Sequence, residues 1–475
     1  MKLKSVLTFL YLAVSIPLFL FFKAEIVVWI SFFVNLLLIT GITHYHLNME
    51  KVFSPFLTSF IVFVYLFFIV APIIQISSIK SNYATFPTNY PYNTADVIYA
   101  NILILIFILI FFIGYVFFKG KQKDYLNNIH SSRSATFSTP LTILSILILC
   151  LIIFGLHYSY TIQDITQSIY TAKEEAVSSL LIKRKVLFII PLGGVIIAHR
   201  YLKEKKKITT NTIVAFLALI VLMCILLFFK NPLAEKRNAL GPIYITLIYL
   251  FKPSLLNSNS KFFLFMFLSM VVAFPVLSTL THIDASLREM VVEPKLIYES
   301  FVRFGGISNA FSSLHYDAFA NIMATVDYVS INGLSYGYQL LSSLLFFVPR
   351  SLWTSKPTST GELVGNYLIE KYEFDYNNLS NPIVSEGFID FGFFGLFFMA
   401  IILAYYVIKL MSWLQSPDPL KKFIAFYFAI HLIFLLRGDL TSGFSYYIGT
   451  LLGVYTIPKL VGRLSRVITK TKIKA

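Results

Sequence analysis

The chain has 475 residues, of which 57% are hydrophobic and only 13% are charged, and its mean hydropathy is +0.75. No soluble domain of this length hides so much apolar surface, so the composition excludes a soluble protein and predicts an all-α polytopic membrane protein. The net charge of +16 raises nucleic-acid binding as an alternative, but the cations are split among separate short segments and no soluble domain is available to hold a basic face.

Membrane-spanning helices are the predicted elements. Each needs about 20 mainly apolar residues, and about 12 segments meet this requirement. The first follows Met1-Lys2-Leu3-Lys4 without a small-residue cleavage site, so we expect a retained anchor. The eighth, at 241–251, is the weakest because it is short and begins with Gly241-Pro242. The predicted centres are Ala13, Val34, Val64, Phe107, Leu149, Gly194, Ile220, Thr246, Ser269, Phe398, Ala429 and Gly449.

The distribution of charge predicts the orientation of these spans. If both termini lie in the cytosol and the spans alternate, the basic segments 119–133, 200–207 and 459–474 all fall inside. This agrees with the excess of Lys and Arg that cytoplasmic loops carry.

Two predicted outer segments carry cations, and the first of them runs against this trend. Lys183-Arg184-Lys185 closes the segment 161–185, either as the solvated end of a helix or as a site for an anionic ligand or lipid headgroup. The turn 230–237 contains Lys230 and Arg237. These cations either snorkel at the interface or hold a lipid-linked phosphate at the membrane surface.

The sequence offers no signal for a metal or cofactor. The eight His residues are scattered without an HExxH spacing, and no glycine-rich phosphate loop is present. Cys150 and Cys224 fall inside predicted spans and are interpreted as packing residues. We therefore expect neither a metal site nor a bound cofactor.

A polar loop at 281–386 divides the chain into an N-terminal membrane bundle (1–280), the loop itself, and C-terminal membrane helices with a basic tail (387–475). A membrane protein usually connects its spans by short turns, so a long loop indicates a site of catalysis or ligand recognition. Apolar residues recur at helical spacing across 307–329 and predict an amphipathic helix, with His315 near its edge. The run 340–348 is too short to span and predicts a re-entrant or interfacial helix.

The stretch Pro349-Arg350-Ser351-Leu352-Trp353-Thr354-Ser355-Lys356-Pro357 follows this run. It is either an ordinary aromatic and basic interfacial anchor or a phosphate site, since guanidinium groups hold phosphate oxygens through bidentate bonds. Downstream, Glu386 and Asp390 are four residues apart and share one face of a helix at its start. They either complement the helix dipole or act as buried functional carboxylates. Arg437-Gly438-Asp439 forms a turn that either contains an internal ion pair or faces a ligand.

These features resemble the bacterial O-antigen and capsular polysaccharide repeat-unit polymerases of the Wzy type. The resemblance rests on the many spans, the large loop and four strings, namely Arg237 to Leu240, Pro349-Arg350-x-x-Trp353-x-x-Lys356-Pro357, Glu386-Gly387 through Phe391-Gly392, and Arg437-Gly438. It implies a fold like that of the multi-span, GT-C-like lipid-sugar glycosyltransferases, in the bacterial inner membrane. The implied substrates are undecaprenyl-pyrophosphate-linked oligosaccharides, joined on the periplasmic side without a nucleotide sugar. It leaves association with a chain-length regulator open.

The physical needs of that reaction can be matched to residues. The leaving group is a lipid diphosphate whose charge grows as the glycosidic bond breaks, so cations are expected there. The candidate cations are Arg237, Arg350, Lys356 and Arg437, followed by Arg303 and Arg288. The candidate bases are Glu386, Asp390, Asp439 and His315, and Tyr316 and Trp353 are candidates for stacking on sugars. We expect the three leading arginines to meet in one outer cavity.

Two other functions fit a chain of this build. One is the ligase that transfers finished glycan to the lipid A core, an enzyme with a similar number of spans and a similar loop. The other is a flippase of the lipid-linked unit, a transporter that often has two related halves around a charged central path. The predicted spans of this chain are nearly free of charge at their centres, which favours chemistry at the surface.

Overall fold

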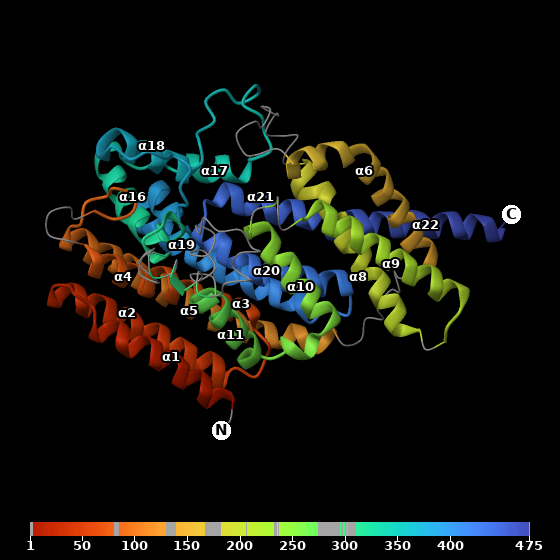
Figure 1. Cartoon of the computed structure of the whole chain (residues 1–475), viewed down its shortest axis with the longest axis horizontal. Helices are drawn as coiled ribbons and strands as arrows, with labels where there is room; N and C mark the ends of the chain where they lie inside the picture. Colours follow the sequence, from red (N-terminus) through yellow and green to blue (C-terminus); the bar gives the residue numbers. More distant parts are fainter. Residues whose placement is uncertain are drawn as a thin grey trace.

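A computed structural model describes residues 3–79, 85–129, 139–166, 182–205, 207–231, 235, 237–273, 295, 298–299, 302 and 310–474. Within this part of the chain every regular element is helical, apart from one isolated bridge between Thr85 and Pro91. The helices pack into an elongated bundle (Figure 1). The main ones are α1 (Leu3–Leu20), α2 (Ile26–His44), α3 (Pro55–Tyr65), α4 (Ala71–Ser78), α5 (Thr94–Ile129), α6 (Pro140–Thr166), α8 (Ile190–Glu204), α9 (Thr210–Phe229), α10 (Arg237–Phe251), α11 (Asn259–Phe267), α16 (Ala318–Asn332), α17 (Tyr338–Leu344), α18 (Thr360–Tyr372), α19 (Ile383–Leu414), α20 (Pro419–Arg437), α21 (Leu440–Thr450) and α22 (Ile457–Lys474).

In the described residues, nine helices are long and apolar enough to cross a membrane, so the chain is an all-α multi-pass membrane protein. Each of the nine contains one of the predicted centres. Of the remaining centres, Thr246 and Ser269 fall near or within the shorter apolar helices Ala239–Phe251 and Asn259–Val271, and Gly449 falls in α21. The count of about 12 spans therefore stays a prediction.

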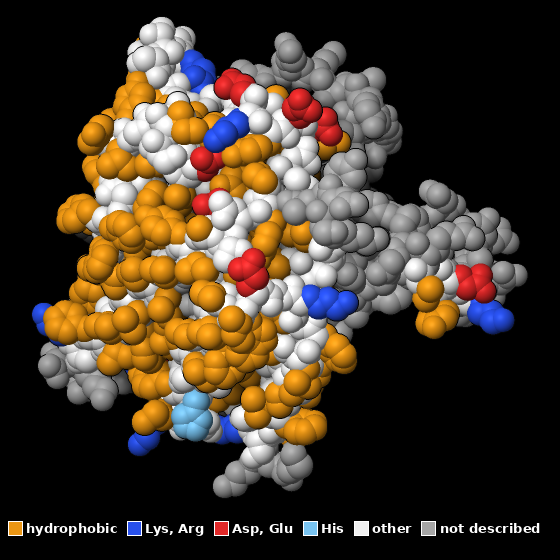
Figure 2. Space-filling model, turned by 90° about the vertical axis from the view of Figure 1, so that its left-hand side faces the viewer, with side chains coloured by type: hydrophobic (Ala, Val, Ile, Leu, Met, Phe, Trp, Pro, Cys, Tyr) orange, Lys and Arg blue, Asp and Glu red, His pale blue; other side chains and the backbone are white. Residues whose placement is uncertain are grey.

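The core of the bundle is built around α3. All of its residues are buried, and it packs against α20 and α11. Its sequence, Pro-Phe-Leu-Thr-Ser-Phe-Ile-Val-Phe-Val-Tyr, is apolar around almost the whole helix, as expected for a helix surrounded by others. By contrast, α1 and α2 expose apolar side chains such as Phe9, Ile16 and Ile26, each more than half accessible. Figure 2 shows hydrophobic side chains covering most of the described surface on one side of the molecule. This is the surface that a lipid environment would cover.

Residues 310–382 pack over one end of the bundle, which we call the loop-side end. Two contacts fix this position. Gln75 Nε2 at the end of α4 donates to the carbonyls of Phe311 and Tyr316, at 2.8 and 3.1 Å. Arg437 at the end of α20 donates to the carbonyl of Leu314 at 3.0 Å. In Figure 1, α16, α17 and α18 lie together beside the start of α19.

The amphipathic helix predicted at 307–329 is shorter than expected. Residues 303–309 lie outside the described part of the chain, a 3-10 turn occupies Leu314–Tyr316, and α16 begins only at Ala318. The first eight residues of α16 are all buried, including Asn321 and Thr325. The helix therefore packs into the protein instead of presenting a polar face there.

The predicted re-entrant run at 340–348 corresponds to α17 and the turn after it. The preceding Gly337 adopts a left-handed conformation, with φ of 87°, and a Cβ at this position would lie 2.8 Å from the Phe391 ring. Glycine is therefore required here by both backbone and packing. Within α19 the helix is interrupted at Phe391 and Gly392, just after Asp390.

The opposite end of the bundle contains a buried polar network around Glu50. Its carboxylate accepts hydrogen bonds from Tyr115 Oη at 2.5 Å and from Lys119 Nζ, and it lies 2.6 Å from His46 Nδ1. The pKa of Glu50 is lowered, because these hydrogen bonds outweigh the opposing effect of burial. Asn259 completes the network by bonding the backbone at Val52 and Ser54.

Candidate functional site

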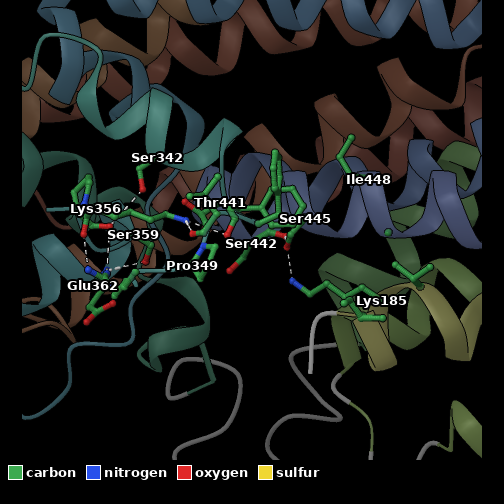
Figure 3. A pocket seen from close by; sticks show the side chains of 18 of the residues that line it. Lys185, Ser342, Pro349, Lys356, Ser359, Glu362, Thr441, Ser442, Ser445 and Ile448 are labelled. Atoms are coloured by element: carbon green, nitrogen blue, oxygen red, sulfur yellow. Dashed lines mark hydrogen bonds between the residues drawn. The ribbon is translucent and has the colours of Figure 1, made fainter. Parts of the chain in front are cut away.

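A cavity of about 840 Å³ lies at the loop-side end of the bundle. Its lining side chains come from three separate parts of the sequence, namely the π-helical turn η4 (Ile182–Val186), residues 342–362 from α17 to the start of α18, and residues 441–452 of α21 and the π-helical turn η9 (Leu451–Thr456). Figure 3 shows Lys356 and Glu362 on one side, Lys185 on the other, and Thr441, Ser442 and Ser445 between them. The volume is in the range of small-molecule binding sites.

Arg350 and Lys356, which belong to one string of the sequence, both line the cavity. Arg350 Nη1 donates to the Lys356 carbonyl, and Nη2 donates to the Pro357 carbonyl at 3.3 Å. These bonds fold the segment 350–357 into a compact loop and use only part of the guanidinium's donor capacity. Arg350 is itself exposed. The Arg350 guanidinium is therefore fixed in position by the protein and remains accessible to a ligand.

The Lys356 ammonium binds the turn that directly follows α17. It donates to the carbonyls of Leu345, Phe346 and Val348, each at 3.0 Å. A cation at a helix C-terminus complements the helix dipole. Burial and then the nearby Arg350 lower the pKa of Lys356. The positive charge is therefore fixed in place at the wall of the cavity.

Lys185 contributes a third cation from the opposite wall. Its ammonium donates to Ser445 Oγ and lies 4.2 Å from the centre of the Tyr446 ring. Gly449 permits this position, because a Cβ there would lie 2.7 Å from both Cβ and O of Lys185. The neighbouring Arg184 is also held in place. The buried Lys230 Nζ donates to the Arg184 carbonyl at 2.9 Å and to Glu235 Oε2 at 3.3 Å. Lys230 therefore anchors the turn that carries Lys185.

Both walls near Lys185 are π-helical turns, η4 and η9. Such turns are rare and often occur at functional sites. Beside them the cavity lining is apolar, with Ile448 in α21, Leu452 in η9 and Ile182 in η4. The cavity therefore joins a cationic, hydroxyl-rich region to an apolar one.

Arg437 lies elsewhere. Its Nη2 donates to Asp317 Oδ1 at 3.2 Å, and Asp317 Oδ1 also accepts from Ser380 Oγ at 2.5 Å. Arg437 is not among the described residues that line the cavity. The structure thus brings Arg350 together with Lys356 and Lys185, and it does not bring Arg437 into the same cavity.

The side chains of the other predicted cations are not described. Arg237 is the first residue of α10, and its side chain lies outside the described part of the structure. Arg288 and Arg303 lie outside the described residues.

The predicted acidic candidates hold the backbone around the cavity. Glu386 is 4% exposed, and its Oε1 accepts hydrogen bonds from Thr360 Oγ1 and the Leu440 backbone N–H, both at 2.6 Å. Asp439 Oδ1 accepts from the Ser442 N–H at 2.7 Å and caps α21, and burial raises the pKa of its carboxyl. These two carboxylates shape the start of α21 and of α18.

Asp390 binds the start of α17. Its two oxygens accept backbone N–H groups of Gly337, Gln339 and Leu340 at 3.1, 3.2 and 2.8 Å. A carboxylate that accepts several backbone N–H groups in this way stabilises the helix N-terminus.

The remaining predicted residues are distributed around the site. Tyr316 is fully buried, with its ring centre 4.6 Å from Phe311 and 5.6 Å from Phe67. Trp353 Nε1 donates to Tyr338 Oη at 3.2 Å, at the outer edge of the 349–357 loop. His315 is exposed on the 3-10 turn before α16. We give none of them a role in the cavity.

Sequence reasoning missed Glu362 and the hydroxyls of the lining, Ser342, Ser359, Thr441, Ser442 and Ser445. Single hydroxyl residues carry no spacing signal, so only the fold could identify them. The signal for Lys185 was present, because a basic triplet in a segment predicted to face outward breaks the expected charge asymmetry.

Among the described residues, no group of three or more His, Cys, Asp or Glu side chains is placed to hold a metal ion. No family model matches the chain, and no curated protein or solved structure is found to be similar to it. A function therefore has to be inferred from the residues that line the cavity.

Proposed function

We propose that this chain is a polymerase that joins undecaprenyl-pyrophosphate-linked oligosaccharide units into long O-antigen or capsular polysaccharide. The reaction would take place on the periplasmic side of a bacterial inner membrane, with both termini in the cytoplasm. The sequence resemblance suggests this activity, and the chemistry of the cavity is compatible with it.

The observation that carries the proposal is the amphiphilic lining of the cavity. Lys185, Arg350 and Lys356 supply positive charge from two walls, and the hydroxyls of α21 lie between them. Charge-assisted bonds from Arg350 and Lys185 suit a diphosphate, and Lys356 adds a fixed positive charge beside them. The apolar side chains include Ile182 and Phe347, which are 56% and 63% exposed. They suit the lipid that is attached to the diphosphate.

In this mechanism the cations act on the leaving group. As the bond between the anomeric carbon and the phosphate oxygen breaks, negative charge accumulates on the diphosphate. Fixed cations stabilise that charge without reorganising, because their positions are already set by the protein. Arg350 is held by two carbonyls and Lys356 by three, which is the preorganisation that this role requires.

The test is chain elongation by the purified, full-length protein in lipid nanodiscs, supplied with undecaprenyl-diphosphate-linked oligosaccharide. The expected product is a ladder of longer lipid-linked chains. Arg350→Ala should slow elongation by about 100-fold, the scale of losing one preorganised donor to a developing oxyanion. Arg200→Ala is the control, because Arg200 is exposed and pairs with Glu204 at the far end of α8.

Three outcomes would contradict the proposal. If the wild-type protein transfers its glycan to lipid A core and makes no ladder, it is a ligase. If it only moves the lipid-linked unit across the bilayer, it is a flippase. If Arg350→Ala elongates as fast as Arg200→Ala, the cavity is not the site of the reaction.

A further inference from the structure

Glu362 is the single carboxylate among the described residues that line the cavity. It lies in the first turn of α18, and Arg350 and Lys356 line the same cavity. The side chain is partly exposed. Figure 3 shows it next to Ser359 and close to the Lys356 side of the cavity.

The local sequence predicts that the Glu362 side chain caps the start of α18. Ser359-Thr360-Gly361-Glu362 has the capping-box pattern, in which the glutamate side chain folds back onto the backbone N–H of the N-cap residue. Only half of the box is present, because Ser359 Oγ accepts from the Glu362 N–H at 3.4 Å and no reciprocal bond forms. In the described part of the chain, no Lys or Arg is close enough to Glu362 for an ion pair. The Glu362 carboxylate therefore does not cap the start of α18.

The neighbouring carboxylates, by contrast, all accept hydrogen bonds or form ion pairs within the protein. Glu386 accepts from Thr360 and Leu440, Asp390 accepts three backbone N–H groups, and Asp317 pairs with Arg437. None of these three lines the cavity among the described residues. A base for a reaction inside the cavity must reach the substrate hydroxyl there, and Glu362 meets this requirement.

We propose that Glu362 is the general base of the transfer reaction, an inference that rests on the proposed function. The acceptor sugar hydroxyl gives its proton to the Glu362 carboxylate while its oxygen forms a bond to the donor's anomeric carbon. The bond from that carbon to the phosphate oxygen breaks, and its electron pair leaves with the lipid diphosphate. Arg350 and Lys356 neutralise the departing charge, and the proton passes from Glu362 to solvent at the open side of the site.

A structural role predicts different behaviour. An acidic residue in the first turn of a helix stabilises the helix dipole by about 0.3–1 kcal/mol, and Glu362 would then affect stability alone. Glu362→Gln separates the two roles, since the amide keeps the shape of the side chain but cannot take up the proton. The control is Glu370→Gln, an exposed position on the same helix.

The experiment measures kcat, KM and the binding of undecaprenyl diphosphate for full-length protein in nanodiscs. Glu362→Gln should lower kcat by about 100-fold or more, the usual contribution of a general base, and change diphosphate binding by less than about twofold. Glu362→Asp should recover part of the lost rate. Added formate should raise the rate of Glu362→Ala, because a small carboxylate can replace the missing one.

The outcomes distinguish the proposal that Glu362 is the general base from the proposal that the chain is a polymerase. If the wild-type protein elongates chains and Glu362→Gln matches it, the inference is wrong and the proposed function stands. If Glu362→Gln loses binding with unchanged kcat, Glu362 holds substrate and is not the base. If the wild-type protein makes no elongated product, both proposals fall together.

Discussion

Glu386 and Thr360 are joined by a buried hydrogen bond of 2.6 Å between Oε1 and Oγ1, which ties α19 to the start of α18 beside one wall of the cavity. The same carboxylate oxygen accepts the Leu440 N–H. Thr360 begins α18, next to Ser359 and Glu362, and Leu440 begins α21, next to Thr441 and Ser442. One side chain from α19 therefore sets the spacing between residues that are far apart in the sequence.

Glu386→Ala should both destabilise the protein and widen the cavity. It leaves two buried donors without an acceptor, which costs about 1–3 kcal/mol for each group. We expect a lower thermal midpoint in detergent and weaker binding of lipid diphosphate. Glu370→Ala, on the exposed face of α18, should change neither. Unchanged stability in Glu386→Ala would show that the bond does not hold the two walls.

Gly449→Ala tests how Lys185 reaches the cavity. The new methyl would lie 2.7 Å from the Lys185 backbone oxygen, so η4 must move away and draw the ammonium from Ser445. Such overpacking costs about 1–3 kcal/mol. We expect a loss of diphosphate affinity, measured by titration with undecaprenyl diphosphate.

Gly155→Ala is the matched control for this substitution. Gly155 lies inside α6 with nothing within 4 Å of a built Cβ. Alanine there should be neutral or stabilising by up to about 1 kcal/mol. Equal affinities for the two variants would mean that the approach of Lys185 to Gly449 has no part in binding.

The pH dependence of binding should report on Lys356. Burial and Arg350 lower the pKa of this ammonium below 10.5, so its charge is fully present at low pH and disappears at a lower pH than for an ordinary lysine. Diphosphate binding should therefore weaken as the pH rises through this lowered pKa. Lys356→Arg should keep its charge and bind without that alkaline decrease. A decrease that is identical in both proteins would assign it to another group.

Glu50 gives a prediction at the other end of the bundle. Glu50→Ala removes the partner of Lys119 and the acceptor of Tyr115, and breaking a buried pair in this way costs about 3–5 kcal/mol. The thermal midpoint should fall markedly, whereas diphosphate affinity in the remaining folded protein should be unchanged. Glu204→Gln removes an exposed pair with Arg200 and should have an effect below about 1 kcal/mol.

The pH dependence of stability at Glu50 has a definite sign. Its pKa is lowered in the folded protein, so its stabilising contribution is present above the ordinary glutamate pKa of 4.5 and is lost as the pH falls through the lowered value. Acid unfolding curves of wild type and Glu50→Gln should therefore converge at low pH. Curves that diverge further in acid would contradict this assignment.

Much of the fold was predictable because a membrane imposes strong local rules. Backbone groups in lipid must bond within a helix, so a run of about 20 apolar residues is enough to predict one. Each of the nine span-length helices in the described residues contains a predicted centre. The polar loop and its Pro349-to-Pro357 string were likewise visible, as was the basic triplet ending at Lys185.

The partners of the charged side chains could be known only from the tertiary structure. Lys185 meets Ser445 across 260 residues, and Arg437 meets Asp317 across 120 residues. Local composition says nothing about such pairings, since they depend on how whole helices pack and on single permissive positions such as Gly449. The sequence by itself determined that this is a helical membrane protein whose apolar helices are interrupted by one long polar segment. Packing decided that Arg350 shares its cavity with Lys185, Lys356 and Glu362, because only the folded bundle brings three distant segments to one place.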